Sequence, residues 1–328
     1  MSLLFKVVSL GFFIGLMSSC GTIQKVAIGA SSDLLYEASP SLETEDDWET
    51  FKNGIPGNLK LIEVLYSVKP NDEKLLVNLT KGYAGYAFGI NETLYLDDVY
   101  PEKKDFSLHK ERAVINYSKA LKYGLEFLKL NGVTHKALTS NMRKNKGIST
   151  LLDNNLKNVD HHRTGVLFTA QALAGLININ GKDKMALAGQ LPIAKGLFDW
   201  VCAKDPKISF GACDIFYATY EVSRPFGNRQ KAAAAFEKFF KANPHNWLAR
   251  MVYTQFFIME SGEEEDWDKQ KVFMDKASRL HQNKVKWMPN YKGHKAFSNP
   301  NLGFFQAMAL KRYEILKNIV EKNKDDIF

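Results

Sequence analysis

Few residues of this 328-residue chain could do chemistry, and the first is a cysteine near the N-terminus. Cys20 ends the stretch LMSSC, which follows an apolar run from Val7 to Met17. That run is short for a membrane span and typical of a secretory signal. LMSSC resembles a bacterial lipobox with Met17 where leucine is more usual. We therefore expect residues 1–19 to be removed and Cys20 to carry a lipid anchor. An ordinary cleaved signal followed by a chance cysteine is the alternative.

The other two cysteines, Cys202 and Cys213, flank the stretch DPKIS, with Cys202 four residues before Pro206 and Cys213 four residues after Ser209. A helical hairpin that bends at this stretch could bring them together, and an exported compartment permits oxidation. Two buried free thiols that behave as small apolar side chains are the alternative. The spacing leaves both states open.

Catalytic and metal-binding patterns are absent from the sequence. It has no glycine-rich phosphate loop followed by Lys-Ser/Thr and no His-Glu-x-x-His motif. His161 and His162 are the best metal candidates, but neighbouring histidines on a helix point in different directions, and no cysteine or carboxylate has the usual ligand spacing. We expect both to be solvated at a helix start. The acidic run 263–266 fits a first helical turn better than a calcium loop. The sequence thus predicts no catalytic residue, metal or cofactor.

Aromatic residues among small ones are the remaining candidates for a functional site. They lie mainly in the stretches GYAGYAFG, DIFYATY and YTQFFIM, and most such residues belong to a core. Some could instead line an apolar cleft that binds a ligand. The candidates for this role are Tyr83, Tyr86, Phe88, Phe168, Phe216, Tyr217, Tyr220, Tyr253 and Phe257.

The segment 281–301 has little helical periodicity and several aromatic residues. A long loop within a helical protein is usually functional or disordered. We therefore expect it to contact a partner protein through Trp287, Tyr291 and Phe297.

Helical patterns dominate the chain after Cys20, and good strand patterns are nearly absent. With 45% hydrophobic residues the chain can bury a large core. The net charge of +8 is modest, and its basic residues are scattered among acidic ones, which argues against nucleic-acid binding. We predict helices over 23–38, 44–52, 57–69, 72–96, 107–130, 147–156, 159–179, 182–203, 209–222, 228–242, 246–261, 265–280 and 301–322.

Two of these helices end in the same pattern, Ala-x3-Phe-x7-Pro. Tetratricopeptide repeats place a small residue, an aromatic residue and a helix-ending proline at these positions. Any antiparallel helical hairpin can imitate so short a pattern, but two close copies favour one repeated unit. We therefore predict that residues 20–328 form a single all-α domain of stacked antiparallel hairpins, a TPR-like α-solenoid. The repeated positions are Ala194, Phe198 and Pro206, then Ala232, Phe236 and Pro244.

The chain resembles the TRAP transporter T-component family, the TatT lipoproteins, over nearly all of its mature length. Its opening segment has a proline before a Leu-Lys-Leu-Ile-Glu helix and then a Tyr-Ala-x-Tyr-Ala-Phe run. The stretch LFTAQALAGLININ and the ending LKRYEILKNIVEKNKDDIF resemble the family's central and terminal helices. The residues of the opening are Pro56, Leu59, Lys60, Leu61, Ile62 and Glu63, then Tyr83, Ala84, Tyr86, Ala87 and Phe88.

The resemblance implies a lipoprotein that is anchored to a bacterial membrane through Cys20 and faces the periplasm. Because Gly21 rather than aspartate follows, we expect the outer membrane. Family members can form a homotrimer, with an apolar cleft for a hydrophobic small molecule and a periplasmic substrate-binding protein (the P component) as partner. A protein–protein interaction scaffold without a small ligand is the main alternative. An enzyme of envelope metabolism would need a polar catalytic cluster that the sequence lacks.

Overall fold

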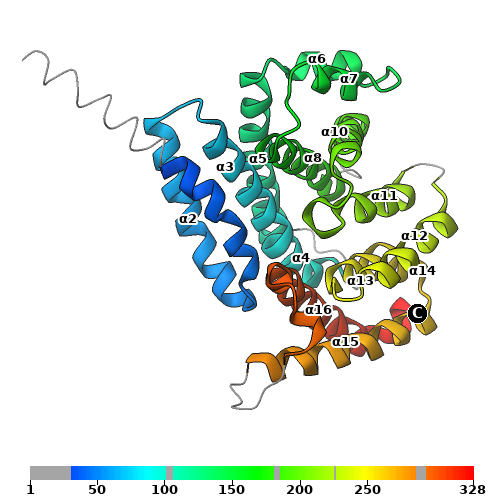
Figure 1. Cartoon of the computed structure of the whole chain (residues 1–328). Coiled ribbons are helices and arrows are strands. Elements are labelled where there is room, and N and C mark those ends of the chain that lie inside the picture. Colours follow the sequence, from blue (N-terminus) through cyan, green and yellow to red (C-terminus); the bar gives the residue numbers. More distant parts are fainter. Residues whose placement is uncertain (1–30, 101–105, 181–184, 225–226, 286–292) are drawn as a thin grey trace, which may run out of the picture.

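The computed structural model of the chain describes residues 31–100, 106–180, 185–224, 227–285 and 293–328. Helices make up most of these ranges, and no strand occurs in them, so the predicted all-α class is confirmed (Figure 1). The predicted signal peptide, Cys20, Trp287 and Tyr291 lie outside the described residues.

The first half of the described chain contains four longer helices and four short ones. Residues 31–38 are helical and lead into the 3-10 turn η1. The elements that follow are η1 (Ser39–Thr44), α2 (Trp48–Val68), α3 (Glu73–Tyr86), the π-helical turn η2 (Ala87–Asn91), α4 (Glu92–Val99), α5 (Leu108–Leu130), α6 (His135–Asn141), α7 (Gly147–Asp153) and α8 (Asp160–Asn180).

The second half continues with shorter helices and then two long ones. Its elements are α9 (Met185–Ala188), α10 (Leu191–Lys204), the 3-10 turn η3 (Ile208–Phe210), α11 (Ala212–Ser223), α12 (Arg229–Ala242), α13 (Trp247–Tyr253), the π-helical turn η4 (Thr254–Ile258), α14 (Met259–Ser261), α15 (Glu264–Val285), the 3-10 turns η5 (Lys295–Phe297) and η6 (Pro300–Leu302), and α16 (Gly303–Ile327).

Side-chain caps fix the starts of the helices that build the N-terminal half. The side chains of Asp72 and Ser107 accept hydrogen bonds from Leu75 N and Lys110 N, three residues into α3 and α5. These bonds satisfy backbone N–H groups that a helix leaves unpaired in its first turn.

Helix α2 is continuous where the sequence suggested two helices, 44–52 and 57–69. It runs through Gly54 and Pro56, although a proline inside a helix costs about 3 kcal/mol. Ile55 and Leu59 are buried, whereas Gly54 and Pro56 are exposed. The apolar face therefore continues past the proline, and its burial outweighs the local cost.

The described parts of the segment 281–301 contain helical structure. Helix α15 continues to Val285, the turn η5 lies within the segment, and the turn η6 begins at Pro300 near its end.

Helix α6 is an element that the sequence patterns did not predict. The described part of the helix predicted over 182–203 forms two helices, α9 and α10.

The alanine and phenylalanine positions of the two repeated patterns are buried, whereas Pro206 and Pro244 are exposed. Ala194 and Ala232 are fully buried, and Phe198 and Phe236 are 4% and 1% exposed. Helix α10 packs against α8, and α12 packs against α11 and α13. A small residue lets the neighbouring helix approach closely, and the aromatic ring fills the space beside it. This packing is consistent with stacked hairpins.

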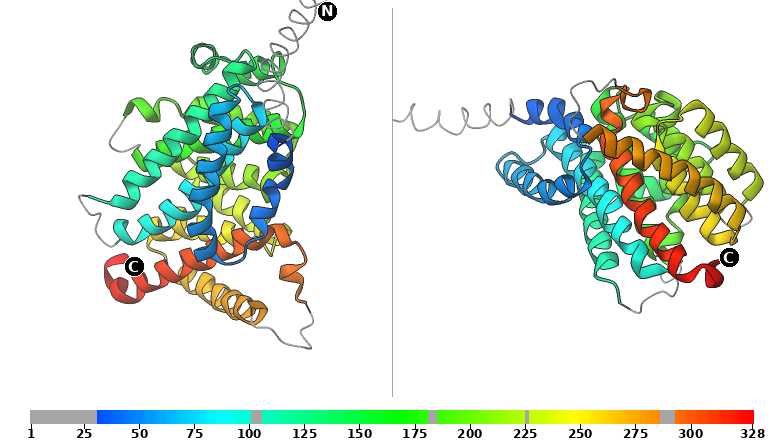
Figure 2. Two further views of the ribbon diagram at one scale, coloured as in Figure 1. Left: turned by 90° about the vertical axis from the view of Figure 1, so that its left-hand side faces the viewer. Right: turned by 90° about the horizontal axis from the view of Figure 1, so that it is seen from below.

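The last helix, α16, packs against elements near the start of the described chain. Helix α16 packs against α13 and also against α4, α2 and η1. Figure 2 shows α15 and α16, in orange and red, across one end of the molecule. The array is therefore closed by its last helix, and the space between its two halves is covered from that side.

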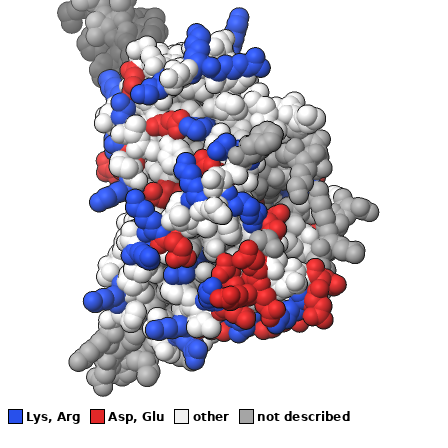
Figure 3. Space-filling view, turned by 90° about the vertical axis from the view of Figure 1, so that its right-hand side faces the viewer, with Lys and Arg blue, Asp and Glu red and all other residues white. Residues whose placement is uncertain are grey.

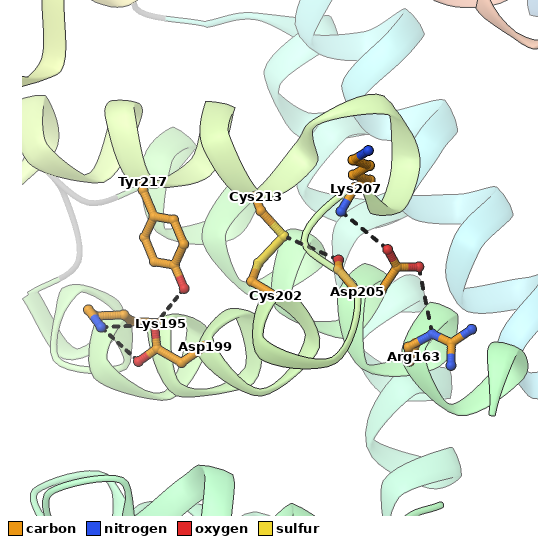
Figure 4. Close-up of a disulfide and its surroundings, with 8 residues drawn as sticks. All are labelled: Arg163, Lys195, Asp199, Cys202, Asp205, Lys207, Cys213 and Tyr217. Carbon is orange, nitrogen blue, oxygen red and sulfur yellow. Dashed lines mark hydrogen bonds and ion pairs between the residues drawn. A yellow bond between two sulfur atoms is a disulfide. The ribbon is translucent and has the colours of Figure 1, made fainter. Parts of the chain in front are cut away.

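A disulfide joins Cys202 of α10 to Cys213 of α11, with their Cα atoms 5.8 Å apart (Figure 4). The bond decides between the two states that the sequence left open. Between the cysteines the backbone reverses through left-handed conformations, ending at Gly211 with φ of 99°. A Cβ on Gly211 would lie 2.2 Å from the ring of Phe239, so the turn requires glycine.

Within the described ranges, none of the helices is both long and apolar enough to cross a bilayer.

Candidate functional site

A cavity of about 1120 Å³ lies between the two halves of the array. Its wall includes residues from η1, α2, α3, η2, α4, α5 and α8 of the first half and from α10, α11, α13, η4 and α16 of the second. A volume of this size suits a ligand of about the size of a drug or larger. Phe304, Phe305 and Met308 of α16 line it, a contribution that no local pattern in the sequence indicates.

Two stacked pairs of aromatic rings form parts of the wall. Phe51 of α2 stacks on Phe304 of α16, with ring centroids 3.5 Å apart. Phe198 of α10 stacks on Phe216 of α11 at 3.7 Å. All four residues line the cavity. Stacking of this kind holds large apolar surfaces in fixed positions, so the wall is apolar and largely preformed.

Four of the nine aromatic residues predicted for a ligand cleft lie in this wall. Phe88 follows α3 in the π-helical turn η2, Phe168 lies on α8, and Phe216 and Tyr220 lie one turn apart on α11. All four are only half-buried by the protein itself. Whether they bind a ligand stays a prediction, but they are placed to contact one.

Two of the predicted tyrosines belong to polar clusters instead of the cavity wall. The hydroxyl of Tyr83 donates to Glu63 Oε1 (2.6 Å), and Tyr123 donates to the same oxygen (3.1 Å). Burial opposes ionisation of Glu63, but hydrogen bonds from Lys60 and Tyr83 lower its pKa to about 2. Tyr83 thus helps to hold α2 against α3 and α5.

The hydroxyl of Tyr217 donates to Asp199 Oδ1 (2.9 Å), which also pairs with Lys195 (Figure 4). The bond links α11 to α10 beside the disulfide. Burial and this bond raise the pKa of Tyr217, so its hydroxyl stays protonated as a donor.

The last three predicted cleft residues pack in the core clusters. Tyr253 stacks on Phe257 at 4.9 Å and also contacts Phe236. Tyr86 is half-buried and packs against both hydrophobic core clusters, one built mainly by α3, α5, α8 and α10 and the other by α12, α13 and α16.

Phe297, predicted to contact a partner, packs edge-on against Trp247, and Lys284 lies over its ring. Phe297 thereby fastens the end of α15 to α13.

A fully buried polar cluster lies beside the cavity. Glu92, which lines the cavity, accepts a hydrogen bond from the hydroxyl of Tyr117 (2.6 Å). Burial raises the pKa of Glu92, although the positive charge of Arg312 and the bond from Tyr117 act in the opposite direction. A Cβ on Gly175 would lie 2.3 Å from the Tyr117 ring, so the ring fits tightly against α8.

Arg312 of α16 joins the two π-helical turns. Its Nη2 donates to the backbone oxygen of Phe88 in η2 (2.7 Å), and its Nη1 donates to Gln255 Oε1 in η4 (3.0 Å). Its Nε donates to Thr93 Oγ1 (3.0 Å). π-helical turns widen a helix locally and frequently occur at functional sites. Both turns supply cavity residues, so Arg312 fixes part of the wall from behind.

The two neighbouring histidines are not solvated as the sequence suggested. His161 Nε2 and His162 Nε2 each lie 3.3 Å from Glu73 Oε2, and His162 is buried. Among the described residues, these three form the group that could hold a metal ion. However, the backbone N–H of Lys157 donates to His162 Nδ1 (3.0 Å). His162 Nε2 therefore carries its proton and donates it to Glu73, which favours a hydrogen-bonded cluster over metal ligation.

Charge is distributed unevenly over the surface. Figure 3 shows one face, on which Lys and Arg are scattered while acidic side chains gather in its lower half. The first turn of α15 carries Glu264, Glu265 and Asp266, and acidic side chains stabilise the start of a helix. The described part of this face carries no continuous basic surface.

The sequence patterns missed two polar residues of the cavity wall, Asn78 and Glu92, and Arg312 behind it. Asn78 lies among leucines on the apolar face of α3, and a polar residue on such a face is a usable signal. Arg312 lies in the stretch LKRYEIL and looks like an exposed charge. Only the packing of α16 against α4 buries it.

Fold and cavity together define the class: an all-α protein whose helical hairpins enclose a largely apolar cavity. The profile of the TRAP transporter T-component family matches residues 44–277, more than half of the chain, and the chain belongs to this family. No curated protein matches it. Membership associates the chain with TRAP transport and with other TRAP transporter components, in the cell envelope. The family is a transport-associated component and is not known as an enzyme.

Proposed function

We propose that the protein binds a hydrophobic small molecule in the cavity and relays it to or from a TRAP-type periplasmic substrate-binding protein. The observation that supports this most is the preformed cavity of about 1120 Å³, walled by stacked aromatic rings. Burial of apolar ligand surface supplies affinity of roughly 25 cal/mol per Å². A cavity of this size can therefore hold an apolar molecule without any charged contact.

The proposal includes the location of the protein. A lipid on Cys20 would hold it at a membrane, with the outer membrane favoured, and leave the helical array in the periplasm. Assembly into a homotrimer would place several cavities beside partner molecules. Labelling of cells with an alkyne analogue of palmitate tests the anchor, since Cys20→Ala should abolish the label.

A substitution that fills the cavity tests the binding function. Gly85 of α3 lines the cavity, and a Cβ added there has no atom within 4 Å. Gly85→Trp should therefore fold normally, because helix interiors favour most residues over glycine by up to about 1 kcal/mol. Its indole ring would occupy cavity space and weaken binding of N-phenyl-1-naphthylamine, measured by fluorescence, by roughly tenfold or more.

Gly54→Trp is the matched control. Gly54 lies on α2, is exposed, and a Cβ there also meets nothing within 4 Å. This variant should bind the fluorophore like the wild type. The chain from Gly21 onward retains every described residue and can be used for both measurements.

The outcome separates the relay from a pure interaction scaffold. Under the proposal, wild type binds the fluorophore, and Gly85→Trp loses it while still binding the substrate-binding protein. A wild-type protein that binds this partner but takes up neither the fluorophore nor a lipid from cells would refute the relay and favour the scaffold.

A further inference from the structure

Two asparagines in the cavity wall have buried amide atoms without a hydrogen-bond partner. Asn78 of α3 is 5% exposed, and neither its Nδ2 nor its Oδ1 has a partner. Asn246, before α13, is 4% exposed. Its Nδ2 donates to the backbone oxygen of Phe210 (2.8 Å), which fixes the orientation of the amide and leaves its Oδ1 unpaired. Both residues line the cavity.

Unpaired amides of this kind are unusual. Roughly nine-tenths or more of buried polar groups in proteins have a hydrogen-bond partner, because an unpaired one has lost its bonds to water. Leucine has the same number and branching of side-chain heavy atoms as asparagine and would fit an apolar wall without this cost. The amide of Asn78 thus offers its Nδ2–H groups as donors and its Oδ1 as an acceptor to whatever fills the cavity.

The charged side chains around the cavity do not favour an ionised ligand. In the described part of the wall, the charged residues are two basic ones, Lys81 and Arg229, and three acidic ones, Glu43, Glu92 and Glu260. Lys81 is already paired with Glu43 (2.8 Å), and Arg229 donates to the backbone oxygen of Phe257. A carboxylate head would meet acidic groups as well as basic ones, so it gains little net attraction.

We propose, building on the ligand-binding function above, that the natural ligand is an amphiphile whose uncharged head group both donates and accepts hydrogen bonds. A hydroxyl or a carboxamide has this chemistry. Asn78 Nδ2–H donates to the head-group oxygen, and Asn78 Oδ1 accepts from its O–H or N–H. Asn246 Oδ1 accepts from a second donor, and the apolar body of the ligand lies against the aromatic wall.

Four short-chain compounds that differ in the head group test the proposal. Octan-1-ol and octanamide donate and accept, heptyl methyl ether only accepts, and octanoate is ionised at about pH 8. Each is used to displace N-phenyl-1-naphthylamine from the wild-type chain beginning at Gly21. Octan-1-ol and octanamide should bind roughly tenfold more tightly than the ether and octanoate, because only they satisfy both atoms of Asn78.

The variant Asn78→Leu should remove this preference, so that the alcohol and the amide bind no more tightly than the ether. It should also unfold at a higher temperature than the wild type, since it replaces unpaired buried atoms. Asn78→Ala gives a second variant with a smaller side chain. Asn318→Leu is the matched control, because Asn318 is exposed on α16 and should change neither property.

The results separate this proposal from the proposed function. Equal affinities for all four compounds, or a preference for the alcohol that persists in Asn78→Leu, would mean that water alone satisfies the amide and would overturn the head-group inference only. Tightest binding of octanoate would overturn it too, in favour of charge recognition at Lys81. A wild type that takes up neither the fluorophore nor any compound would overturn the cavity function and the inference together.

Discussion

Replacement of Arg312 by methionine should destabilise the protein in a strongly pH-dependent way. Arg312 is fully buried, and its charge acts against the burial that raises the pKa of Glu92. In Arg312→Met this favourable charge is lost, so the pKa of Glu92 rises further above its ordinary value of 4.5. Three acceptors also lose their donor, on Thr93, Gln255 and Phe88.

The sign of the pH dependence follows from proton uptake. An acid whose pKa is raised by folding binds its proton more tightly in the folded state, so its contribution to stability is lost as pH rises above the unfolded value of 4.5. Each pH unit in that window changes the free energy of unfolding by up to about 1.4 kcal/mol. Between about pH 5 and about pH 7.5, the variant should therefore lose up to about 3 kcal/mol more stability than the wild type.

At about pH 7.5 the total loss should reach about 3–5 kcal/mol, as for other broken buried charge pairs. Urea unfolding followed by circular dichroism at several pH values measures it. The double variant Arg312→Met, Glu92→Gln should recover the pH-dependent part, since it removes the group that titrates.

Arg250→Met serves as the control, because the guanidinium of Arg250 lies over the ring of Phe273 at 3.8 Å and only partly inside the protein. Its effect should be nearly the same at each pH. An equal loss for Arg312→Met at pH 5 and pH 7.5, or no recovery in the double variant, would refute the assignment of Glu92 as a buried acid balanced by Arg312.

Further substitutions test the packing around the cavity. Gly175→Ala should lower the free energy of unfolding by about 1–3 kcal/mol, because its Cβ would overlap the ring of Tyr117, and a neutral result by urea unfolding would contradict the tight fit. Replacement of both Cys202 and Cys213 by serine should lower the free energy of unfolding by about 3 kcal/mol, as expected for a loop of this length. Mass spectrometry of the denatured, unreduced wild type should find no free-thiol pair at these positions. His162→Gln should make the free energy of unfolding less sensitive to acid. Burial lowers the pKa of His162, so the wild type loses stability as pH falls below 6.5. A variant whose stability falls with acid as much as that of the wild type would exclude His162 as the cause.

Local patterns predicted most helices well. The helix predicted at 107–130 is observed at Leu108–Leu130, and that at 228–242 at Arg229–Ala242, because caps and prolines mark their ends. Helix α2 is continuous despite Gly54 and Pro56, because the burial of Ile55 and Leu59 is a tertiary effect that local patterns do not show. The packing of Phe297 on Trp247 is likewise a tertiary contact that the pattern of 281–301 did not indicate.

The cavity wall was only partly predictable. Aromatic content singled out Phe88, Phe168, Phe216 and Tyr220, but it could not separate them from Tyr83 and Tyr253, which have the same composition around them. The difference lies in what each side chain contacts in the folded structure. The hydroxyl of Tyr83 donates to Glu63, whereas Phe216 stacks on Phe198 and also lines the cavity.

The sequence by itself determined the all-α class, the positions of most helices and the family, because helix periodicity, caps and helix-ending prolines act over a few residues. Only the tertiary structure decided that the array closes, that a cavity remains inside it, and that Asn78, Glu92 and Arg312 are buried beside that cavity. These features depend on α16 meeting α2 and α4 more than 200 residues away. A contact across such a separation is fixed by the summed packing of every helix between, and no short stretch of sequence contains it.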